Sequence, residues 1–174
     1  MTGRSSYYPQ FQRSLFHAVI RPVLTELGMG GPVAERLVFA TACHESHFHF
    51  RLQQGGEPAL GLWQMEPRTH DDIWDNYLRY RPDIRSLLYD VTGSGVRQPA
   101  RLVHDDFYAC AMCRLHYRRV RDPLPEDVDD IIAIAQYWKD FYNTRLRRGT
   151  TTKFVDDWLQ LVDQTYVFPE DLDE

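Results

Sequence analysis

Residues 45–48 read Glu-Ser-His-Phe, and residues 61–69 read Gly-Leu-Trp-Gln-Met-Glu-Pro-Arg-Thr. A polar segment containing glycine and proline joins the two stretches and predicts a loop. Upstream, Pro32 is a favourable first residue for a helix, and apolar residues follow it at helical spacing. We therefore expect a buried helix that runs from Pro32 to about Glu45, with the Glu45 carboxyl group at its C-terminal end.

Helical periodicity continues through the rest of the chain, and no segment shows the sustained alternation of a strand. We expect Pro22 to kink the first helix. The expected helices span residues 11–27, 32–45, 70–81, 83–89, 102–121, 126–142 and 150–162. The sequence thus predicts an all-α, mainly helical fold, with at most a small β-hairpin near residues 49–62. It forms one domain, residues 1–174, with flexible tails at 1–10 and 168–174.

Composition narrows the class of protein. The 174 residues carry a net charge of -5, and 43% of them are hydrophobic, which suits one globular domain and not a basic nucleic-acid-binding module. The apolar runs fall short of the ~20 residues that a membrane-spanning helix needs. The first twelve residues lack the apolar core of a secretory signal. We expect a protein made in the cytoplasm without a signal peptide or a transmembrane segment.

Glu45 is the candidate catalytic residue. A carboxylic acid can protonate a leaving oxygen near neutral pH when an apolar environment disfavours its ionised form. The helix before Glu45 is apolar, and Phe48 follows closely. An exposed glutamate at a helix end is the ordinary alternative, and for Glu45 taken alone it is the better interpretation; the downstream stretch at residues 61–69 favours the catalytic one.

The two quoted stretches together resemble the active-site signature of the lysozyme-like superfamily, which contains soluble lytic transglycosylases and goose-type lysozymes. The resemblance implies that Glu45 is the catalytic acid and that Ser46, Gly61 and Gln64 belong to the saccharide site. Trp63 stands where the family usually has Met. The Glu45–Gly61 bridge also lacks the family's usual Pro-x-Ala-x-Ser and is one residue longer.

A third family motif, Ala-Tyr-Asn-x-Gly, has its best counterpart at Tyr142 and Asn143, although Thr144 and Arg145 replace the usual x-Gly. The resemblance implies that Tyr142 holds the catalytic Glu and that Asn143 faces the substrate. Tyr137 and Trp138, one turn earlier, are interpreted as core residues.

The expected activity is cleavage of the β-1,4 bond between the MurNAc and GlcNAc sugars of peptidoglycan. Lytic transglycosylases of the resembled family use one Glu and the muramic 6-hydroxyl, whereas goose-type lysozymes use acidic residues to place a water. Candidates for a second carboxylate are four: Glu57, Glu66, Asp71 and Asp72. We favour the single-Glu transglycosylase and keep a hydrolytic lysozyme as the alternative.

Two rival interpretations start from other features. Cys43, His44, His47 and His49 crowd one segment, but His44-Glu45-Ser46-His47 lacks the H-E-x-x-H spacing that places two ligands on one helix face. No metal or other cofactor is therefore expected. The second rival is a non-enzymatic structural component with a lysozyme-like fold.

The three cysteines do not indicate a disulfide framework. The C-x-x-C pair at Cys110 and Cys113 lies in a helical stretch, so we expect buried thiols on a helix face, as for Cys43. The basic run at residues 114–121 is interpreted as a solvated face, with contact to anionic wall polymers as the weaker alternative.

A wall-degrading enzyme without a signal peptide needs another route to its substrate. The segment around Tyr142 resembles sequences of phage and prophage wall-degrading proteins. We expect a virion-associated protein that acts in the host periplasm or cell wall, with an endolysin as the alternative. Its partners would be peptidoglycan glycan strands and other virion proteins, without nucleic acid.

Overall fold

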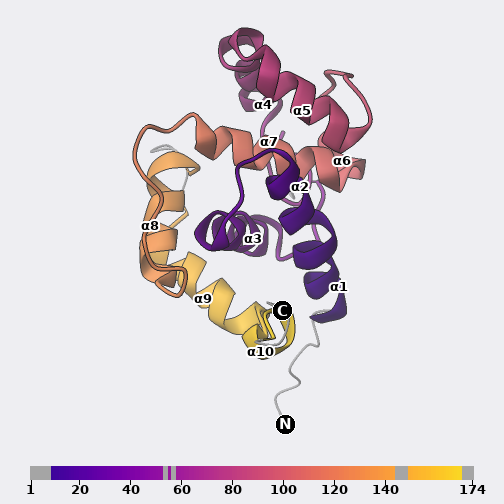
Figure 1. Ribbon diagram of the computed structural model, residues 1–174. Helices are drawn as coiled ribbons and strands as arrows, with labels where there is room; N and C mark the ends of the chain where they lie inside the picture. The colour runs from indigo at the N-terminus through magenta and orange to yellow at the C-terminus, as the bar shows by residue number, and fades with distance from the viewer. Residues whose placement is uncertain (1–8, 53–54, 56–57, 144–148, 170–174) are drawn as a thin grey trace.

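The computed structural model describes residues 9–52, 55, 58–143 and 149–169 (Figure 1). Within these ranges the chain is mainly helical and contains no strand, which confirms the all-α class. The hairpin expected near residues 49–62 is reduced to isolated antiparallel bridges, Leu52 with Leu60 and Leu60 with Met65. No helix in the described part of the chain is both long and apolar enough to cross a membrane.

Helix α3, Pro32–Ser46, lies at the centre of the fold (Figure 1). It is buried almost all round, as expected for a helix whose apolar residues are not confined to one stripe. Its neighbours are the N-terminal helical segment, α7, α8 and α9. Pro32 occupies the first turn, and the helix ends at His47 in the left-handed conformation. The predicted boundaries are confirmed, including the position of Glu45 in the last turn.

The N-terminal segment is helical from residue 9 to 26, but its middle is a π-helix. Helix α1 spans Pro9–Ser14, η1 spans Leu15–Ile20 and α2 spans Arg21–Glu26. Pro22 has no N–H to give to the preceding turn. The chain adjusts just before it, because the N–H of Arg21 donates to the carbonyl five residues back, at Phe16. The expected perturbation by Pro22 therefore takes the form of a wider helical turn.

Several predicted helix boundaries are wrong. Helix α4, Pro67–Asn76, begins before the predicted 70–81 helix, because Pro67 supplies the first turn and Glu66 the cap position. The long helix expected over residues 102–121 is broken into α6, Arg101–His104, and α7, Asp106–Arg118. The break is at Asp105, whose side chain accepts the Tyr108 N–H and so caps α7.

Between α4 and α6 lie a short 3-10 helix η2, Leu78–Tyr80, and α5, Pro82–Thr92. Helix α5 contains the predicted 83–89 helix and extends past it. These elements pack on one side of α7, and Figure 1 shows α4 and α5 above it in that view.

The C-terminal part consists of α8, Ile131–Phe141, α9, Thr151–Leu161, and α10, Gln164–Val167. Thr150 caps α9, because its hydroxyl accepts the Lys153 N–H, and the helix lies within the predicted range 150–162. Helix α8 begins later than predicted, since its cap is Asp130. Phe168 packs against Phe16 and the core, so the folded body extends into the predicted C-terminal tail. The rest of both predicted tails, 1–8 and 170–174, lies outside the described residues.

Candidate functional site

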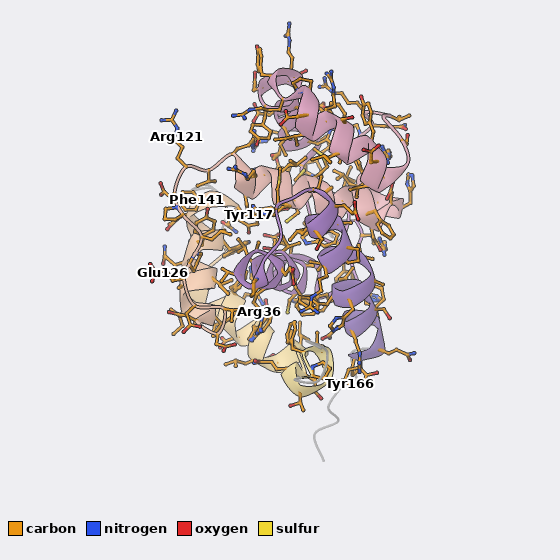
Figure 2. The ribbon with its side chains drawn as sticks, in the orientation of Figure 1. Arg36, Tyr117, Arg121, Glu126, Phe141 and Tyr166 are labelled. Carbon is orange, nitrogen blue, oxygen red and sulfur yellow. The ribbon has the colours of Figure 1, made fainter. Side chains whose placement is uncertain are left out.

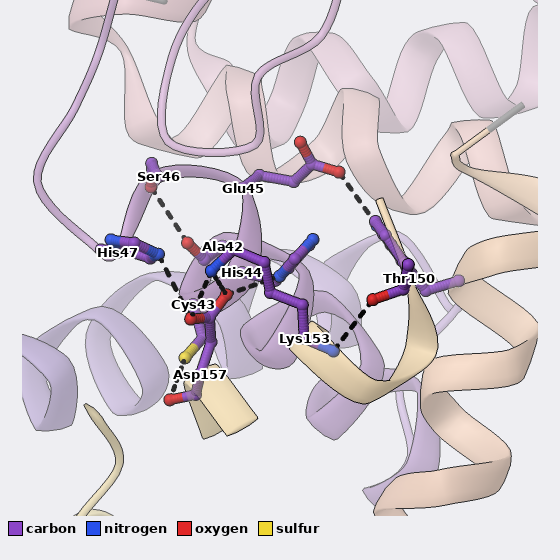
Figure 3. Close-up of polar contacts among 10 residues, drawn as sticks. Ala42, Cys43, His44, Glu45, Ser46, His47, Thr150, Lys153 and Asp157 are labelled. Atoms are coloured by element: carbon purple, nitrogen blue, oxygen red, sulfur yellow. Dashed lines mark hydrogen bonds and ion pairs between the residues drawn. The ribbon is translucent and has the colours of Figure 1, made fainter. Parts of the chain in front are cut away.

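The Glu45 carboxylate lies partly buried in the last turn of α3, facing α8 (Figure 3). Its Oε1 atom accepts a hydrogen bond from the indole N–H of Trp138 at 2.9 Å. Trp138 is itself fully buried. A donor held rigidly in the core therefore fixes the direction of a carboxylate that solvent still reaches.

The loop that carries the second motif is tight and closed on itself. Leu60 and Met65 exchange two backbone hydrogen bonds, each of 3.0 Å. Gly61 sits inside this turn with φ of 75°, and a Cβ atom placed there would lie 2.0 Å from the Leu102 carbonyl oxygen. Glycine is required here for its conformation and for the close approach of the α6 backbone. The close approach at Gly61 is thus to the protein's own chain.

Tyr142 joins this loop to α8. Its hydroxyl donates to the Trp63 carbonyl oxygen at 2.6 Å, and the Trp63 indole in turn donates to the Val38 carbonyl oxygen of α3 at 2.8 Å. Trp138 and Tyr142 are four residues apart and share one face of α8. That face therefore contacts both Glu45 and the loop at residues 61–64. The segments of the three predicted motifs thus meet beside α8.

The three remaining predicted site residues are held by local contacts. The Gln64 amide donates to the carbonyl oxygens of Gly61 at 2.8 Å and Phe50 at 3.3 Å. The Ser46 hydroxyl donates to the Ala42 carbonyl oxygen one turn back at 3.0 Å. Asn143 is buried and accepts from Lys139 at 3.2 Å. These hydrogen bonds are all to groups of the protein itself. Direct contact of these side chains with a sugar stays a prediction.

The backbone is strained in residues 45–48 and 61–69, the two stretches that carry the first and second motifs. Among the described residues, the non-glycine positions with positive φ are His47 at 51°, Phe48 at 58° and Gln64 at 45°. Each such position costs about 1–3 kcal/mol, and such strain is concentrated at functional sites in proteins. Two of them lie two and three residues after Glu45, and the third lies in the loop that Tyr142 contacts, so the strain coincides with the candidate site.

The histidines beside Glu45 serve an ion-pair cluster with α9. The Asp157 carboxylate pairs with His44 Nδ1 at 2.7 Å, with His47 Nε2 at 3.5 Å and with Lys153 Nζ at 3.1 Å (Figure 3). Burial tends to raise the pKa of Asp157, but hydrogen bonds from the two histidines and Lys153 outweigh it and hold this pKa well below its ordinary value. The Asp157 carboxylate therefore stays ionised at neutral pH, and its contacts tie α9 to the end of α3.

The contacts of these histidines also concern the alternative interpretation of this segment as a metal site. In the part of the chain that the structure describes, no three His, Cys, Asp or Glu side chains are grouped as a metal ion would require. The His44 ring instead stands edge-on to Trp138, with centroids 4.5 Å apart. His44 thus packs against the residue that holds Glu45.

The cysteines occupy buried helix positions, as predicted. Cys43, Cys110 and Cys113 are free thiols in the core. Burial raises the pKa of each of them above the ordinary thiol value, so none is set up as a nucleophile.

The candidates for a second carboxylate have partners elsewhere. Asp71 pairs with His70 at 3.0 Å and with Arg97 at 3.3 Å, and Asp72 pairs with Arg119. Glu66 pairs with Arg68. The fourth candidate, Glu57, lies outside the described residues, as do Thr144 and Arg145 of the third motif.

Sequence reasoning missed the role of Trp138, although it placed this residue in the core, where it is. The signal was present: Trp138 lies one helical turn before Tyr142, so any site on the Tyr142 face of α8 would include it. A buried tryptophan also needs an acceptor for its N–H, and a nearby carboxylate provides one.

The fold and site define a mainly helical protein with a partly exposed glutamate held at the end of its central helix. No family model, curated protein or solved structure matches this chain.

Proposed function

We propose that the protein cleaves the β-1,4 MurNAc–GlcNAc bond of peptidoglycan and that Glu45 is its single catalytic residue. The observation that supports this most directly is the Trp138–Glu45 hydrogen bond at the end of the buried helix. It orients the carboxyl group that would give its proton and take one back. The sequence resemblance supplies the substrate, and the strained backbone next to Glu45 adds to the case.

In the first step, protonated Glu45 gives its proton to the glycosidic oxygen, and the bond between that oxygen and the muramic C1 breaks. In the second step, the Glu45 carboxylate takes the proton of the muramic 6-hydroxyl as that oxygen bonds to C1. The product is a 1,6-anhydro ring, and Glu45 ends as it began. The ion pairs of Asp71 and Asp72 support this pathway over one that needs a second free carboxylate.

The decisive experiment compares wild type with Glu45→Gln on purified peptidoglycan. The amide oxygen can still accept the Trp138 N–H, so we expect the variant to fold. Because general acid catalysis contributes about 10²–10⁴-fold, we expect the rate to fall by at least about a hundredfold. Glu126→Gln, at an exposed position after α7, is the matched control and should keep full activity.

Mass analysis of the digestion products separates the alternatives. Anhydro-muropeptides identify a transglycosylase, and reducing ends identify a hydrolytic lysozyme. If wild type and Glu45→Gln both release no product, the proposal of an enzyme is wrong and a structural component of a phage particle becomes the better interpretation.

We further propose that the protein is carried in the phage virion. The support is the resemblance of the segment around Tyr142 to sequences of phage and prophage wall-degrading proteins. Mass spectrometry of purified particles tests this: the protein should co-purify with them, and its presence only in the lysate would favour an endolysin.

A further inference from the structure

A cavity with several arginines in its lining lies at the C-terminal end of α7. It has a volume of about 220 Å³, and the segment that follows α7, residues 120–124, forms one wall. Arg114, Arg118 and Arg121 also line it, with the Tyr137 ring of α8. The proposed catalytic function uses none of these residues.

Arg114 is the unusual member of this group. Arg114 is only 7% exposed, yet in the described part of the chain no carboxylate pairs with its guanidinium group. Its one hydrogen bond is from Nε to the Met29 carbonyl oxygen at 2.9 Å. That bond fixes the guanidinium plane and leaves its terminal N–H groups for another acceptor. The terminal nitrogens are not among the buried atoms without a partner, so they open onto the cavity, where an anion that is not part of the protein could reach them.

Arg118 and Arg121 extend the same positive surface toward solvent. Both are exposed, and in the described residues neither forms an ion pair or a hydrogen bond through its side chain. Figure 2 shows Arg121 reaching outward from the segment after α7. Asp122 also lines the cavity, but it pairs with none of the three arginines. The neighbouring Arg119 shows the contrast, because it pairs with Asp72 of α4.

The electrostatics of the cavity agree with its geometry. Burial lowers the pKa of Arg114, and the positive charge of Arg118 lowers it further. Two guanidinium groups therefore repel each other across the cavity. A bound anion would remove that repulsion, and the planar fork of an arginine matches the oxygens of phosphate and carboxylate groups.

We propose that this cavity binds a small organic phosphate, with its oxygens on Arg114, Arg118 and Arg121 and its organic part against Tyr137. Phosphate is favoured over a single carboxylate because three cations converge on one cavity. Val120, Pro123 and Leu124 give the cavity an apolar side that a bare ion would leave uncovered.

The site is separate from the candidate active site. Met29, which holds Arg114, precedes the N-terminus of α3, whereas Glu45 lies in its last turn. Tyr117, which also lines the cavity, is the link between the two sites, because its ring centroid lies 5.2 Å from that of Tyr142. Arg118 and Arg121 are exposed, and in the described residues no contact joins either side chain to Glu45. Substitutions at these two arginines should therefore leave catalysis unchanged.

The test is a titration of the full chain with glycerol phosphate, followed by NMR of the arginine Nε–H groups. The Arg114 Nε–H signal should be observable because it is held by the Met29 carbonyl oxygen. We expect it to shift in a saturable manner. Arg118→Gln/Arg121→Gln should weaken binding by at least about tenfold, the effect of losing charge-assisted hydrogen bonds. Inorganic phosphate should bind more weakly, because it cannot cover the apolar side.

The matched control is Arg79→Gln/Arg85→Gln, which removes the same charge from residues that do not line the cavity. It should bind glycerol phosphate like wild type. Equal weakening in both double variants would mean nonspecific attraction and would overturn the proposal, as would a wild-type titration without saturation. If acetate binds as tightly as glycerol phosphate, the assignment to phosphate is wrong.

Discussion

At the residue scale, the candidate site depends on how Trp138 holds Glu45. The indole N–H is rigid, because its ring is packed between His44 and Phe154, with centroid distances of 4.5 and 5.0 Å. A hydrogen bond to a charged group contributes about 1.5–3 kcal/mol. This contact is therefore strong enough to select one orientation of the carboxylate.

Replacing Trp138 with Phe tests this role. The ring remains, but the donor to Glu45 is lost, and we expect peptidoglycan cleavage to fall by about ten- to a hundredfold, the rate equivalent of 1.5–3 kcal/mol. Trp158→Phe is the control, because it removes the same atoms from another buried tryptophan, for which no contact with Glu45 is seen. Equal loss of activity in both variants would indicate a general packing effect.

A second polar residue in the interior, His70, makes stability depend on pH. The ring is buried between the Asp71 carboxylate, 3.0 Å from Nδ1, and the Tyr108 hydroxyl, 2.6 Å from Nε2. Trp74 donates to the same hydroxyl at 2.9 Å. The neutral ring with its proton on Nδ1 satisfies all of these groups, since the hydroxyl then donates to Nε2. Burial, with a smaller contribution from nearby arginines, lowers the pKa of His70.

The sign of the pH effect follows from this shift. The unfolded chain binds a proton at His70 near pH 6.5, whereas the folded protein resists it until lower pH. The free energy of unfolding should therefore fall as the pH drops from 6.5 toward the folded pKa, by at most about 1.4 kcal/mol per pH unit. Urea unfolding of wild type and His70→Gln from pH 7.5 to 5 measures it. The same pH slope in both proteins would contradict the assignment.

At the element scale, the central helix α3 could be predicted because residues within and next to it determine where it begins and ends. Pro32 starts it, and the apolar run after it has no polar face to expose. The break at Asp105 could not be predicted, because the apolar pattern continues on both sides of it. Only the capping of Tyr108 and the ion pair of Asp105 with Arg101 make the interruption favourable. The π-helix at residues 15–20 could not be predicted either, because its apolar residues have the same spacing as those of an ordinary α-helix.

Two glycines test how the second-motif loop packs on α6. Gly61→Ala should lower the free energy of unfolding by about 2–6 kcal/mol, because strain at positive φ adds to a clash with the Leu102 carbonyl oxygen. Gly93→Ala, with φ of 63° and no atom within 4 Å of the new Cβ, should cost only about 1–2 kcal/mol. Chemical denaturation of both variants gives the comparison, and equal costs would exclude the close approach.

At the scale of the whole molecule, α3 is the element through which distant parts are connected. The Trp63 indole and the Tyr117 hydroxyl both bond to it, at Val38 and Thr41. Asp157 adds α9 to the same helix through His44. The residues of the candidate site come from segments that are about a hundred positions apart in the sequence, and they meet because each contacts α3 or the face of α8 beside it.

The Asp157 ion pairs should contribute to the stability of the whole fold. Since the pKa of Asp157 is lowered on folding, its contribution is fully present above the ordinary value of 3.8 and is lost as the pH falls through the folded value. We expect Asp157→Asn to be less stable than wild type at pH 7, and the difference to shrink below pH 3.8. Thermal unfolding at several pH values measures this. A difference that grows on acidification would contradict it.

The site itself was only partly predictable from the sequence. Local motifs mark Glu45 and the loop at residues 61–64, because strain and tight turns demand particular residues. The contacts between segments, such as Trp138 with Glu45, depend on tertiary packing that no local pattern contains. Gln64 illustrates the difference: its position in the motif is local, but its amide is used by the loop's own carbonyl groups.

Arg51 and Gly61 give the loop between the two motifs a closed base. The Gly61 N–H donates to the Arg51 carbonyl oxygen at 2.8 Å, and the Arg51 side chain binds Asp106 and the Val103 carbonyl oxygen. The chain leaves and re-enters the body at one anchored point. Doubling the length of such a loop costs only about 0.6 kcal/mol of closure entropy. A change in the length of the connection between the two motifs should therefore cost the fold little, as long as the closure between Arg51 and Gly61 is kept.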